Sequence, residues 1–219
     1  MPALASSRER EAVADDQATV HVIDDDVSLR DSLSLLLPCV GLEVRSYASV
    51  QEFLDAGPHD APGCIVLDVR LPGISGLDFQ SRSDALGVHL PIVLMTGHSD
   101  VPMSVRAMKA GAVDFLPKPF RDQDMIDAVT AAIERDRERR AAESAAADIR
   151  DRYASLSPRE QQVMARVTAG KMNKQVAFDL GLSEITVKTY RGAVMQKMAA
   201  RTFADLVRMA DALALCASA

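Results

Sequence analysis

No apolar stretch in this sequence approaches the roughly 20 residues that a membrane-spanning helix requires. Residues 1–18 mix Arg, Glu and Asp with small residues, so they also lack the apolar core of a secretory signal. These absences exclude a membrane-spanning protein. We therefore expect a cytoplasmic protein that has no membrane partner.

Cysteine is scarce, and its three positions, Cys39, Cys64 and Cys216, are far apart. An odd number of cysteines at wide spacings fits neither a disulfide framework nor a zinc site, and it suits a reducing compartment. We expect all three cysteines to be small packing residues.

What the sequence does contain is typical of a globular protein. Its 219 residues are 48% hydrophobic and 26% charged, which leaves room for one large domain or two small ones. Residues 1–155 hold 16 Lys and Arg against 26 Asp and Glu, whereas residues 156–219 hold 9 against 5. This asymmetry is typical of a chain that handles cations or regulation in one part and a polyanion in the other. Chance variation in surface charge would produce the same asymmetry.

Short β-branched runs alternate with helical patterns through the acidic part of the chain. The expected strands are residues 19–23, 42–47, 64–67, 91–95 and 113–116. Between them, apolar residues recur at helical spacing. Five strands that alternate with helices predict an α/β doubly wound, five-stranded parallel sheet covered on both faces.

Polar residues follow these strands where each of them ends. They are Asp24, Asp25, Asp68, Thr96 and Lys118. Because the carboxyl ends of parallel strands meet at one edge, we expect these side chains to converge there. Crowded carboxylates repel one another unless a cation lies among them, and oxygen ligands suit Mg²⁺. One aspartate could then form an acyl phosphate, because metal and lysine neutralise the incoming phosphoryl oxygens.

Residues 123–153 contain neither proline nor glycine, and they are rich in Ala, Glu and Arg, which predicts one long helix. The apolar pattern of a coiled-coil seam is missing between Ile133 and Ile149. The middle, residues 136–140, has almost no apolar stripe. We therefore expect it to extend between two domains as a semi-rigid spacer.

The basic end of the chain contains helix start and stop signals in close succession. In chain order they are Ser157, Pro158 and Glu160 at a helix start, Gly170 at its end, Asn173 as a second cap, Gly181 in a turn and Ser183 as a third cap. In the third helix, spacing turns Val187 and Val194 inward and leaves Lys188, Thr189 and Gly192 outward. With a last helix at residues 203–213, a small all-α four-helix domain is predicted.

The acidic part of the chain resembles a response-regulator receiver domain. The matching motifs are Asp24-Asp25, Asp68 before Leu71-Pro72-Gly73, Thr96-Gly97-His98 and Asp114-Phe115-Leu116-Pro117-Lys118-Pro119, in this order and spacing. Acidic residues at strand ends are common, so each motif alone is weak, whereas the full set in register is specific. The resemblance covers residues 18–136 and implies a flavodoxin-like receiver fold.

This resemblance implies a role for each matching residue. Asp68 would be the phosphoacceptor, with Thr96 and Lys118 in contact with its phosphoryl group. Phe115 would be the switch aromatic that changes rotamer together with Thr96. The implied Mg²⁺ ligands are Asp24, Asp25, Asp68 and the backbone carbonyl of Arg70. The peptide bond between Lys118 and Pro119 is a candidate cis bond, and Asp26 is a candidate helix cap.

The basic part resembles the LuxR-type helix-turn-helix of NarL/FixJ-family regulators. The matching motifs are Leu156-Ser157-Pro158-Arg159-Glu160, Ala169-Gly170-Lys171, and Leu180-Gly181-Leu182-Ser183 followed by Thr186-Val187-Lys188. The resemblance implies that the helix over residues 184–198 enters the major groove of DNA. The implied DNA-binding residues are Lys174, Thr186, Lys188, Thr189, Arg191 and Lys197. Tyr190 and Gly192 depart from the family pattern, and Gly192 leaves a gap in base readout.

Among these residues, Lys188 and Thr189 would reach base edges, whereas Lys174, Arg191 and Lys197 would contact phosphates. The two resemblances divide the chain into a flexible tail (1–17), a receiver domain (18–136), a helical linker (137–155) and a DNA-binding domain (156–219). They imply a FixJ-like two-component response regulator. A sensor histidine kinase would phosphorylate Asp68, and a phosphorylation-promoted homodimer would bind promoter DNA and act on RNA polymerase. The only catalysis would be self-catalysed phosphotransfer to its own aspartate.

Two alternatives remain open. The run from Asp24 to Ser28 resembles the D-x-D-x-[ST] motif of haloacid-dehalogenase-type phosphatases, in which Asp24 would be the nucleophile and Asp26 the acid. That function would leave Asp68 and the basic tail without a purpose. In the second alternative, the helical end of the chain binds a protein instead of DNA.

Overall fold

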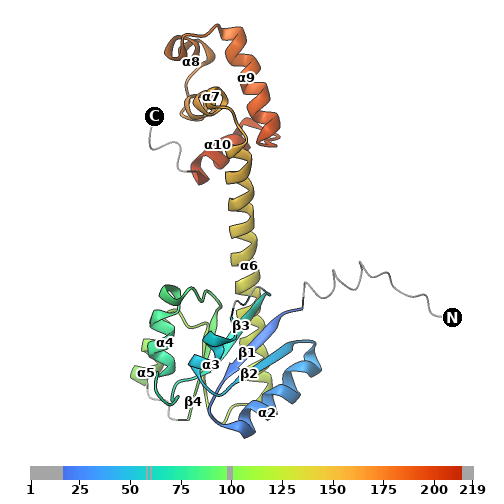
Figure 1. The fold of residues 1–219 in the computed structure, drawn as a ribbon, viewed down its shortest axis with the longest axis vertical. Coiled ribbons are helices and arrows are strands. Elements are labelled where there is room, and N and C mark those ends of the chain that lie inside the picture. The colour runs from blue at the N-terminus through green and yellow to red at the C-terminus, as the bar shows by residue number, and fades with distance from the viewer. Residues whose placement is uncertain (1–16, 58, 60, 98–100, 214–219) are drawn as a thin grey trace, which may run out of the picture. The chain divides into compact units, whose positions relative to one another are not determined.

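The structure is a computed structural model that describes residues 17–57, 59, 61–97 and 101–213 (Figure 1). The chain divides into two compact units, Met1–Arg140 and Ala141–Ala219, and each is described by itself. Across the described ranges, no helix combines the length and apolar character that crossing a membrane requires.

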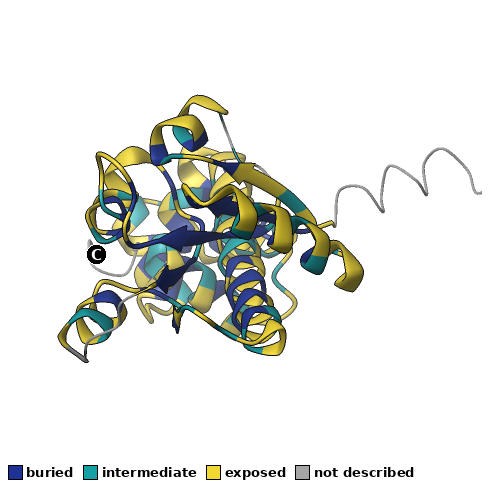
Figure 2. Cartoon of the chain, turned by 90° about the horizontal axis from the view of Figure 1, so that it is seen from below, coloured by how far each residue is buried: buried dark blue, intermediate teal, exposed yellow. Residues whose placement is uncertain are grey.

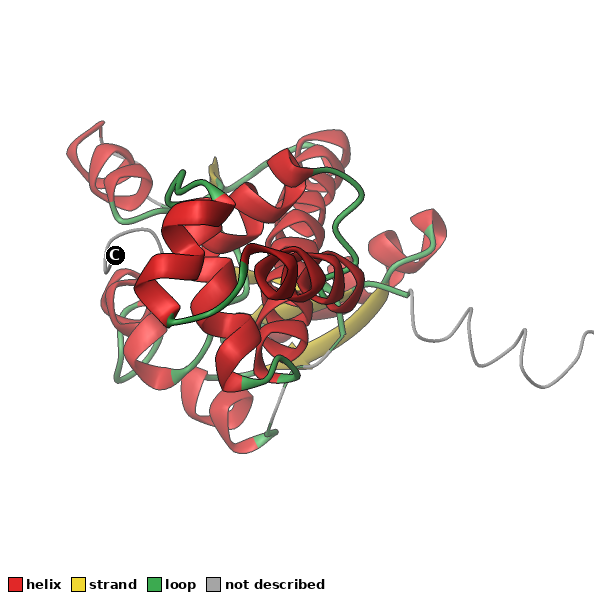
Figure 3. Ribbon diagram, turned by 90° about the horizontal axis from the view of Figure 1, so that it is seen from above, coloured by secondary structure: helices red, strands yellow, loops and turns green. Residues whose placement is uncertain are grey.

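The first unit contains a parallel sheet, whose strands are yellow in Figure 3. Its strands are β1 (Thr19–Ile23), β2 (Glu43–Tyr47), β3 (Gly63–Asp68), β4 (Ile92–Thr96) and β5 (Asp114–Pro117). They lie in the order β2-β1-β3-β4-β5, and every neighbouring pair is parallel. This order confirms the predicted fold class. Parallel strands require crossover connections, and the helices between the β-branched runs provide them.

Helices cover both faces of the sheet. They are α2 (Val27–Leu36), α3 (Val50–Asp55), α4 (Gly76–Arg82), α5 (Val101–Lys109) and α6 (Asp122–Ala154), with short 3-10 helices η1 (Leu37–Val40) and η2 (Asp84–Leu86). On one face, Val22 packs with Leu33 of α2 and Met125 of α6. On the other, Leu67 belongs to the core that contains Phe53 of α3. The two cores explain why the central strands are buried throughout, as Figure 2 shows in dark blue.

The cysteines only partly follow the expectation that they pack in the core. Cys64 in β3 is buried, as predicted. Cys39 is exposed in η1, and its Sγ donates to the carbonyl of Leu35 at 3.2 Å, so the packing prediction is wrong there. In this 3-10 helix Leu37 is the residue that packs into the core, and Cys39 is exposed. Cys216 lies outside the described residues.

Residues 136–140 were expected to extend between two domains, but they belong to the first compact unit, and Asp136, the last residue of the predicted receiver domain, is held within it. Asp136 is fully buried. Its carboxylate accepts from the backbone N–H of Gly63 at 3.1 Å and pairs with Arg139 at 2.6 Å and Arg140 at 2.7 Å. Arg140 also donates to the carbonyl of Ala61 at 2.9 Å. The two guanidinium groups neutralise the buried charge, which makes its burial tolerable.

The second unit contains four further helices, as predicted. They are α7 (Pro158–Thr168), α8 (Asn173–Leu180), α9 (Glu184–Lys197) and α10 (Phe203–Ala212). Val163, Val187, Val194 and Leu206 form part of its core. Val176 and Ala177 of α8 also belong to it, so this core is assembled from one face of each of the helices α7, α8, α9 and α10, in agreement with the helical spacing of apolar residues in the sequence.

The caps of this unit agree with the sequence except at one helix. Ser157 and Glu160 form a reciprocal capping box at α7, and Ser183 caps α9. Asn173 is not a cap: it is the first residue of α8, and Met172 precedes it. The side-chain oxygen of Asn173 instead accepts a hydrogen bond from Arg191 at 2.7 Å. This oxygen is the atom that would otherwise accept from a backbone N–H in a helix cap.

His21 makes the stability of the first unit depend on pH. It is buried in β1 beside Tyr47 and Phe53, and burial, followed by the charges of His59 and Arg45, lowers its pKa to about 3. In the unfolded chain the pKa of this histidine is about 6.5. The contribution of neutral His21 to the free energy of unfolding is therefore complete above pH 6.5 and is lost as the pH falls toward 3. We expect a loss of about 1.4 kcal/mol per pH unit in this window, and about 2 kcal/mol at pH 5. Urea unfolding at several pH values measures it, and His21→Phe should flatten the profile; an unchanged slope in that variant would contradict the assignment.

Candidate functional site

Charged side chains gather at the carboxyl edge of the sheet, where Asp24 follows β1, Asp68 ends β3 and Lys118 follows β5. The Nζ of Lys118 lies 2.6 Å from Oδ2 of Asp24 and 3.3 Å from Oδ1 of Asp68. Carboxylate oxygens of Asp24, Asp25 and Asp68 lie within 4.8 Å of one another. The structure thus brings together four of the residues that the sequence predicted at one edge.

Burial and charge determine the electrostatics of this edge. Desolvation raises the pKa of Asp68; the charge of Lys118 opposes this rise, and that of Asp24 adds to it. Burial lowers the pKa of Lys118, but its hydrogen bond to Asp24 and the charges of both carboxylates outweigh burial and raise it overall. The one ammonium group therefore contacts two of the three carboxylates, Asp24 and Asp68, and the edge retains an excess of negative charge.

The three carboxylates have the chemistry that a hard divalent cation requires. Asp24 and Asp68 are buried and Asp25 is exposed, so the cluster has both fixed ligands and access to solvent. Mg²⁺ binds a few carboxylates and keeps several waters, which an edge that is open on one side allows. The donor set of Asp24, Asp25 and Asp68 therefore fits such a metal ion.

Backbone geometry holds these side chains in place. Oδ1 of Asp24 accepts from the N–H of Asp26 at 2.9 Å, and Oδ1 of Asp26 accepts from the N–H of Ser28. Asp26 is the N-cap of α2, as predicted. The N–H of Lys118 donates to the carbonyl of Thr96 at 2.7 Å, and the peptide bond that joins Lys118 to Pro119 is cis.

Two further predicted residues lie on the strands β4 and β5 and are wholly or partly buried. Thr96 ends β4 and is fully buried. Phe115 is half-buried in β5, where it packs against the core on the α3 side. The backbone N–H of Arg70 donates to the carboxylate of Asp68. This hydrogen bond lowers the pKa of Asp68, but burial has the larger effect and the pKa is raised overall. His98, the last residue of the predicted threonine motif, lies outside the described residues.

Sequence reasoning missed two residues that support this edge. Gly76 is buried at the start of α4, and a Cβ added there would lie 2.3 Å from the backbone oxygen of Asp68. Arg30 of α2 donates to the backbone carbonyl of Asp24 at 2.6 Å. Gly76 could have been noticed in the sequence, because it is one of the turn residues that precede the helix. Its close approach to Asp68 could not, because that approach depends on tertiary packing. No pattern in the sequence indicates the contact of Arg30.

The outer face of α9 is exposed in the second unit, as predicted, and it includes the apolar side chain of Ile185, which is 80% exposed. Lys188 and Thr189 are exposed, whereas Val187 and Val194 are buried. Lys174 on α8 is also exposed, and Thr186 is half-buried. This face therefore combines positive charge with short polar side chains and one exposed apolar side chain, Ile185.

Two other predicted DNA-binding residues take part in contacts within the unit. Arg191 donates to Asn173, and its guanidinium carbon lies 5.2 Å from the centre of the Phe203 ring. Lys197 pairs with Glu160 at 2.8 Å, and this hydrogen bond lowers the pKa of Glu160. Both cations therefore also connect α9 to neighbouring segments of the unit.

Gly192 is exposed on α9, and a Cβ added there would meet no atom within 4 Å. We expect Gly192→Ala to stabilise the second unit by about 1 kcal/mol, because alanine loses less backbone entropy on forming a helix. Thermal unfolding of the full chain measures this effect. A lower melting temperature would contradict this expectation.

Two family models match the chain. The model described as "Response regulator receiver domain" matches residues 20–130, and the model described as "Bacterial regulatory proteins, luxR family" matches residues 154–210. With the parallel sheet and the acidic edge, these matches define a phospho-accepting transcription regulator and not a conventional enzyme. They do not favour the phosphatase alternative.

Relatives with curated descriptions agree. Nodulation protein W of Bradyrhizobium diazoefficiens is 56% identical over 205 residues, which cover 94% of this chain and 90% of that protein. The transcriptional regulatory protein FixJ of Azorhizobium caulinodans is 50% identical over 191 residues, covering 87% of this chain and 90% of that protein. The chain belongs to the response-regulator family in which a receiver domain is joined to a LuxR-type DNA-binding domain.

Solved structures support the fold. The response regulator StyR matches with a TM-score of 0.79 and 43% identity, covering 89% of this chain and 98% of that chain. Full-length FixJ from B. japonicum matches with a TM-score of 0.54 and 45% identity, covering 90% of this chain and 97% of that chain. The family implies a histidine kinase and DNA as partners of this chain.

Proposed function

We propose that Asp68 is the phosphoacceptor of this response regulator. The observation that carries the proposal is the position of its carboxylate, 3.3 Å from the Nζ of Lys118 and within the acidic cluster. An oxygen of Asp68 attacks the phosphorus of a kinase phosphohistidine, the P–N bond breaks, and an acyl phosphate forms. Lys118 and Thr96 stabilise the phosphoryl oxygens, and the catalysis is confined to this self-phosphorylation.

The proposed cofactor is Mg²⁺, held by Asp24, Asp25, Asp68 and the carbonyl of Arg70. When bound, the ion neutralises charge on the phosphoryl oxygens. Asp24 also holds Lys118 in position through their 2.6 Å contact. Thr96 is buried and Phe115 half-buried in adjacent strands, so we assign them the switch that responds when the phosphoryl group draws Thr96 toward it.

The proposed output is sequence-specific binding of promoter DNA by α9. Lys188, Thr189 and Thr186 lie on or beside its outer face and read bases, while Lys174 contacts a phosphate. Arg191 and Lys197 make further phosphate contacts, which compete with the bonds that they form to Asn173 and Glu160.

We infer a cytoplasmic regulator that dimerises on phosphorylation and acts on RNA polymerase. The proposed domains are the tail (1–17), the receiver (18–136), the linker (137–155) and the DNA-binding domain (156–219). The compact units of the structure divide after Arg140, inside the proposed linker. A dimer would place two copies of α9 on a pseudo-palindromic site.

The test is DNA retardation by the full chain on a site selected with the phosphorylated protein. Treatment with a small acyl phosphate and Mg²⁺ should increase the affinity, and a chelator added before treatment should abolish the increase. Affinity that is independent of both would refute the proposed switch. A protein that selects no DNA would refute the output.

In the same assay we expect Lys188→Ala to weaken binding about 10-fold, because one base contact contributes about 1–3 kcal/mol of discrimination. Arg208→Ala removes a positive charge from α10, where Arg208 pairs with Asp205, and is the matched control. Equal losses in the two variants would mean that Lys188 contributes only general charge.

A further inference from the structure

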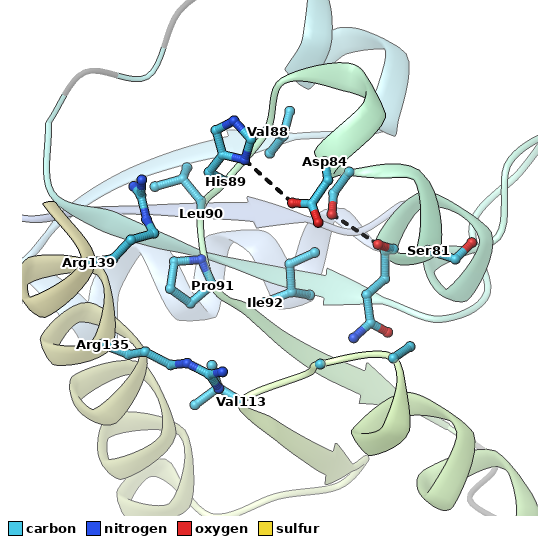
Figure 4. Close-up of a pocket in the computed structure, with 14 residues that line it drawn as sticks. Ser81, Asp84, Val88, His89, Leu90, Pro91, Ile92, Val113, Arg135 and Arg139 are labelled. Carbon is cyan, nitrogen blue, oxygen red and sulfur yellow. Dashed lines mark hydrogen bonds and ion pairs between the residues drawn. The ribbon is translucent and has the colours of Figure 1, made fainter. Parts of the chain in front are cut away.

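A hollow lies between α4, η2 and α6 in the first unit (Figure 4). Two of its charged side chains, Arg135 and Asp84, are exposed, and Asp84 lies 3.4 Å from His89. The amide of Gln80 is buried, and its Oε1 is inaccessible to solvent. Among the described residues that line it, the hollow therefore offers a ligand no buried polar side chain within reach.

In the second unit, the outer face of α9 exposes an apolar side chain near its amino-terminal end. Ile185 is the second residue of α9, and Lys188 and Thr189 lie one turn further along the same face. All three side chains are exposed. A single exposed apolar side chain is common on protein surfaces. This one, however, lies on the face that is proposed to enter the major groove, where binding would remove it from water.

The hydroxyl groups beside Ile185 are already hydrogen-bonded within the helix and its cap. Oγ1 of Thr189 donates to the carbonyl of Ile185 at 3.1 Å, so its one proton is not available to a base. Oγ1 of Thr186 lies 2.8 Å from Oγ of Ser183, the cap of α9. What Thr189 can still offer a base is an acceptor oxygen and its methyl group.

The outer face of α9 therefore has few donors and a relatively large apolar surface. Gly192, one turn after Lys188, contributes no side chain, and a Cβ added there would meet no atom within 4 Å. Of Ile185, Lys188 and Thr189, Lys188 has protons left to donate to a base. In the major groove, thymine displays an apolar group, its C5 methyl, and apolar side chains contact it there.

We infer that Ile185 recognises thymine by packing against its C5 methyl group, with the methyl group of Thr189 as a second contact. The inference rests on the proposed binding of DNA by α9 and adds the kind of base that it reads. The positive charge of Lys188 complements the DNA and brings this face to it. Because Ile185 and Lys188 are one helical turn apart, they contact the same or neighbouring base pairs.

The test uses the full chain and the DNA site that it selects after treatment with an acyl phosphate and Mg²⁺. Each thymine of the site is replaced in turn by deoxyuridine, which keeps every hydrogen-bonding group but lacks the methyl group. Retardation at a fixed salt concentration measures the affinity. We expect a loss of about fourfold at one or two thymines of each half-site, as one buried methyl group would give.

Ile185→Ala should reduce the affinity for the thymine site by a similar factor, and deoxyuridine at the sensitive position should then cause no further loss. Lys188→Ala should weaken binding but keep the effect of deoxyuridine. Leu35→Ala is the matched control, because it removes another exposed apolar side chain, from α2 of the first unit. It should change neither the affinity nor the effect of deoxyuridine.

Two substitutions at position 189 separate its methyl group from its hydroxyl group. Thr189→Val replaces the hydroxyl by a methyl group and should keep the affinity within twofold. Thr189→Ser keeps the hydroxyl, removes the methyl group and should weaken binding about fourfold. The opposite order of affinities would overturn the apolar role of Thr189.

The role of Ile185 is overturned if deoxyuridine is tolerated at every thymine, or if Ile185→Ala keeps the full effect of deoxyuridine. It is also overturned if Lys188→Ala abolishes that effect as completely as Ile185→Ala does. In each of these cases the chain still binds DNA, so the proposed function stands without this inference. If the chain selects no DNA, both are refuted.

Discussion

Asp68→Asn should abolish the incorporation of an acid-labile phosphoryl group from a small acyl phosphate. The carboxamide keeps the size of the side chain but removes the anionic oxygen that attacks phosphorus. We expect at least a 100-fold loss of label, because Asp24 and Asp25 differ from Asp68 in their contacts: Asp24 already pairs with Lys118 at 2.6 Å, and Asp25 is exposed. Labelling with radioactive phosphodonor, followed by acid treatment, measures the loss.

Asp26→Asn is the matched control, because it makes the same chemical change two residues from Asp24. Asn is as good a helix cap as Asp, so α2 should be unaffected. We expect its labelling to match that of the unmodified chain. Label retained in Asp68→Asn, or mapped to Asp24 by peptide analysis, would refute the assignment and return attention to the phosphatase alternative.

Gly76→Ala should damage both stability and phosphorylation. The new methyl group would lie 2.3 Å from the backbone oxygen of Asp68 and 3.1 Å from Leu67, so backbone and side chain must both move. We expect a loss of at least about 2 kcal/mol in the free energy of unfolding. The labelling rate of the fraction that folds should fall about 10- to 100-fold, because small displacements of a reacting group are costly.

Urea unfolding and labelling of the same preparation separate the two effects. The control is Gly192→Ala, which adds the same methyl group where nothing lies within 4 Å. It should leave labelling unchanged. If Gly76→Ala lost stability but kept its labelling rate, the glycine would serve the fold only and would not position Asp68.

The fold could be predicted because its signals are local. The runs that became β1 and β3 end at carboxylates, and helical patterns separate them, so a parallel sheet was the consistent solution. The meeting of Asp24, Asp68 and Lys118 followed from that topology, since all three lie at strand ends. Ser157 and Glu160 predicted the start of α7 because a capping box lies within four consecutive residues.

What could not be predicted depends on contacts between distant segments. Asp136 looked like part of a polar spacer, because nothing near it in the sequence indicates that Gly63 and Arg140 would surround it. Asn173 was assigned as a cap, but Arg191 is its partner. In both cases the side chain forms its contact with a residue that is distant in the sequence. The spacing of apolar and polar residues does not predict such contacts.

Glu160 has two duties in the second unit, since it completes the capping box of α7 and pairs with Lys197 of α9. A substitution at either position therefore removes the partner of the other. A chimera that receives α9 from another regulator keeps this connection between α7 and α9 only if the new helix offers Glu160 a cation where Lys197 now lies.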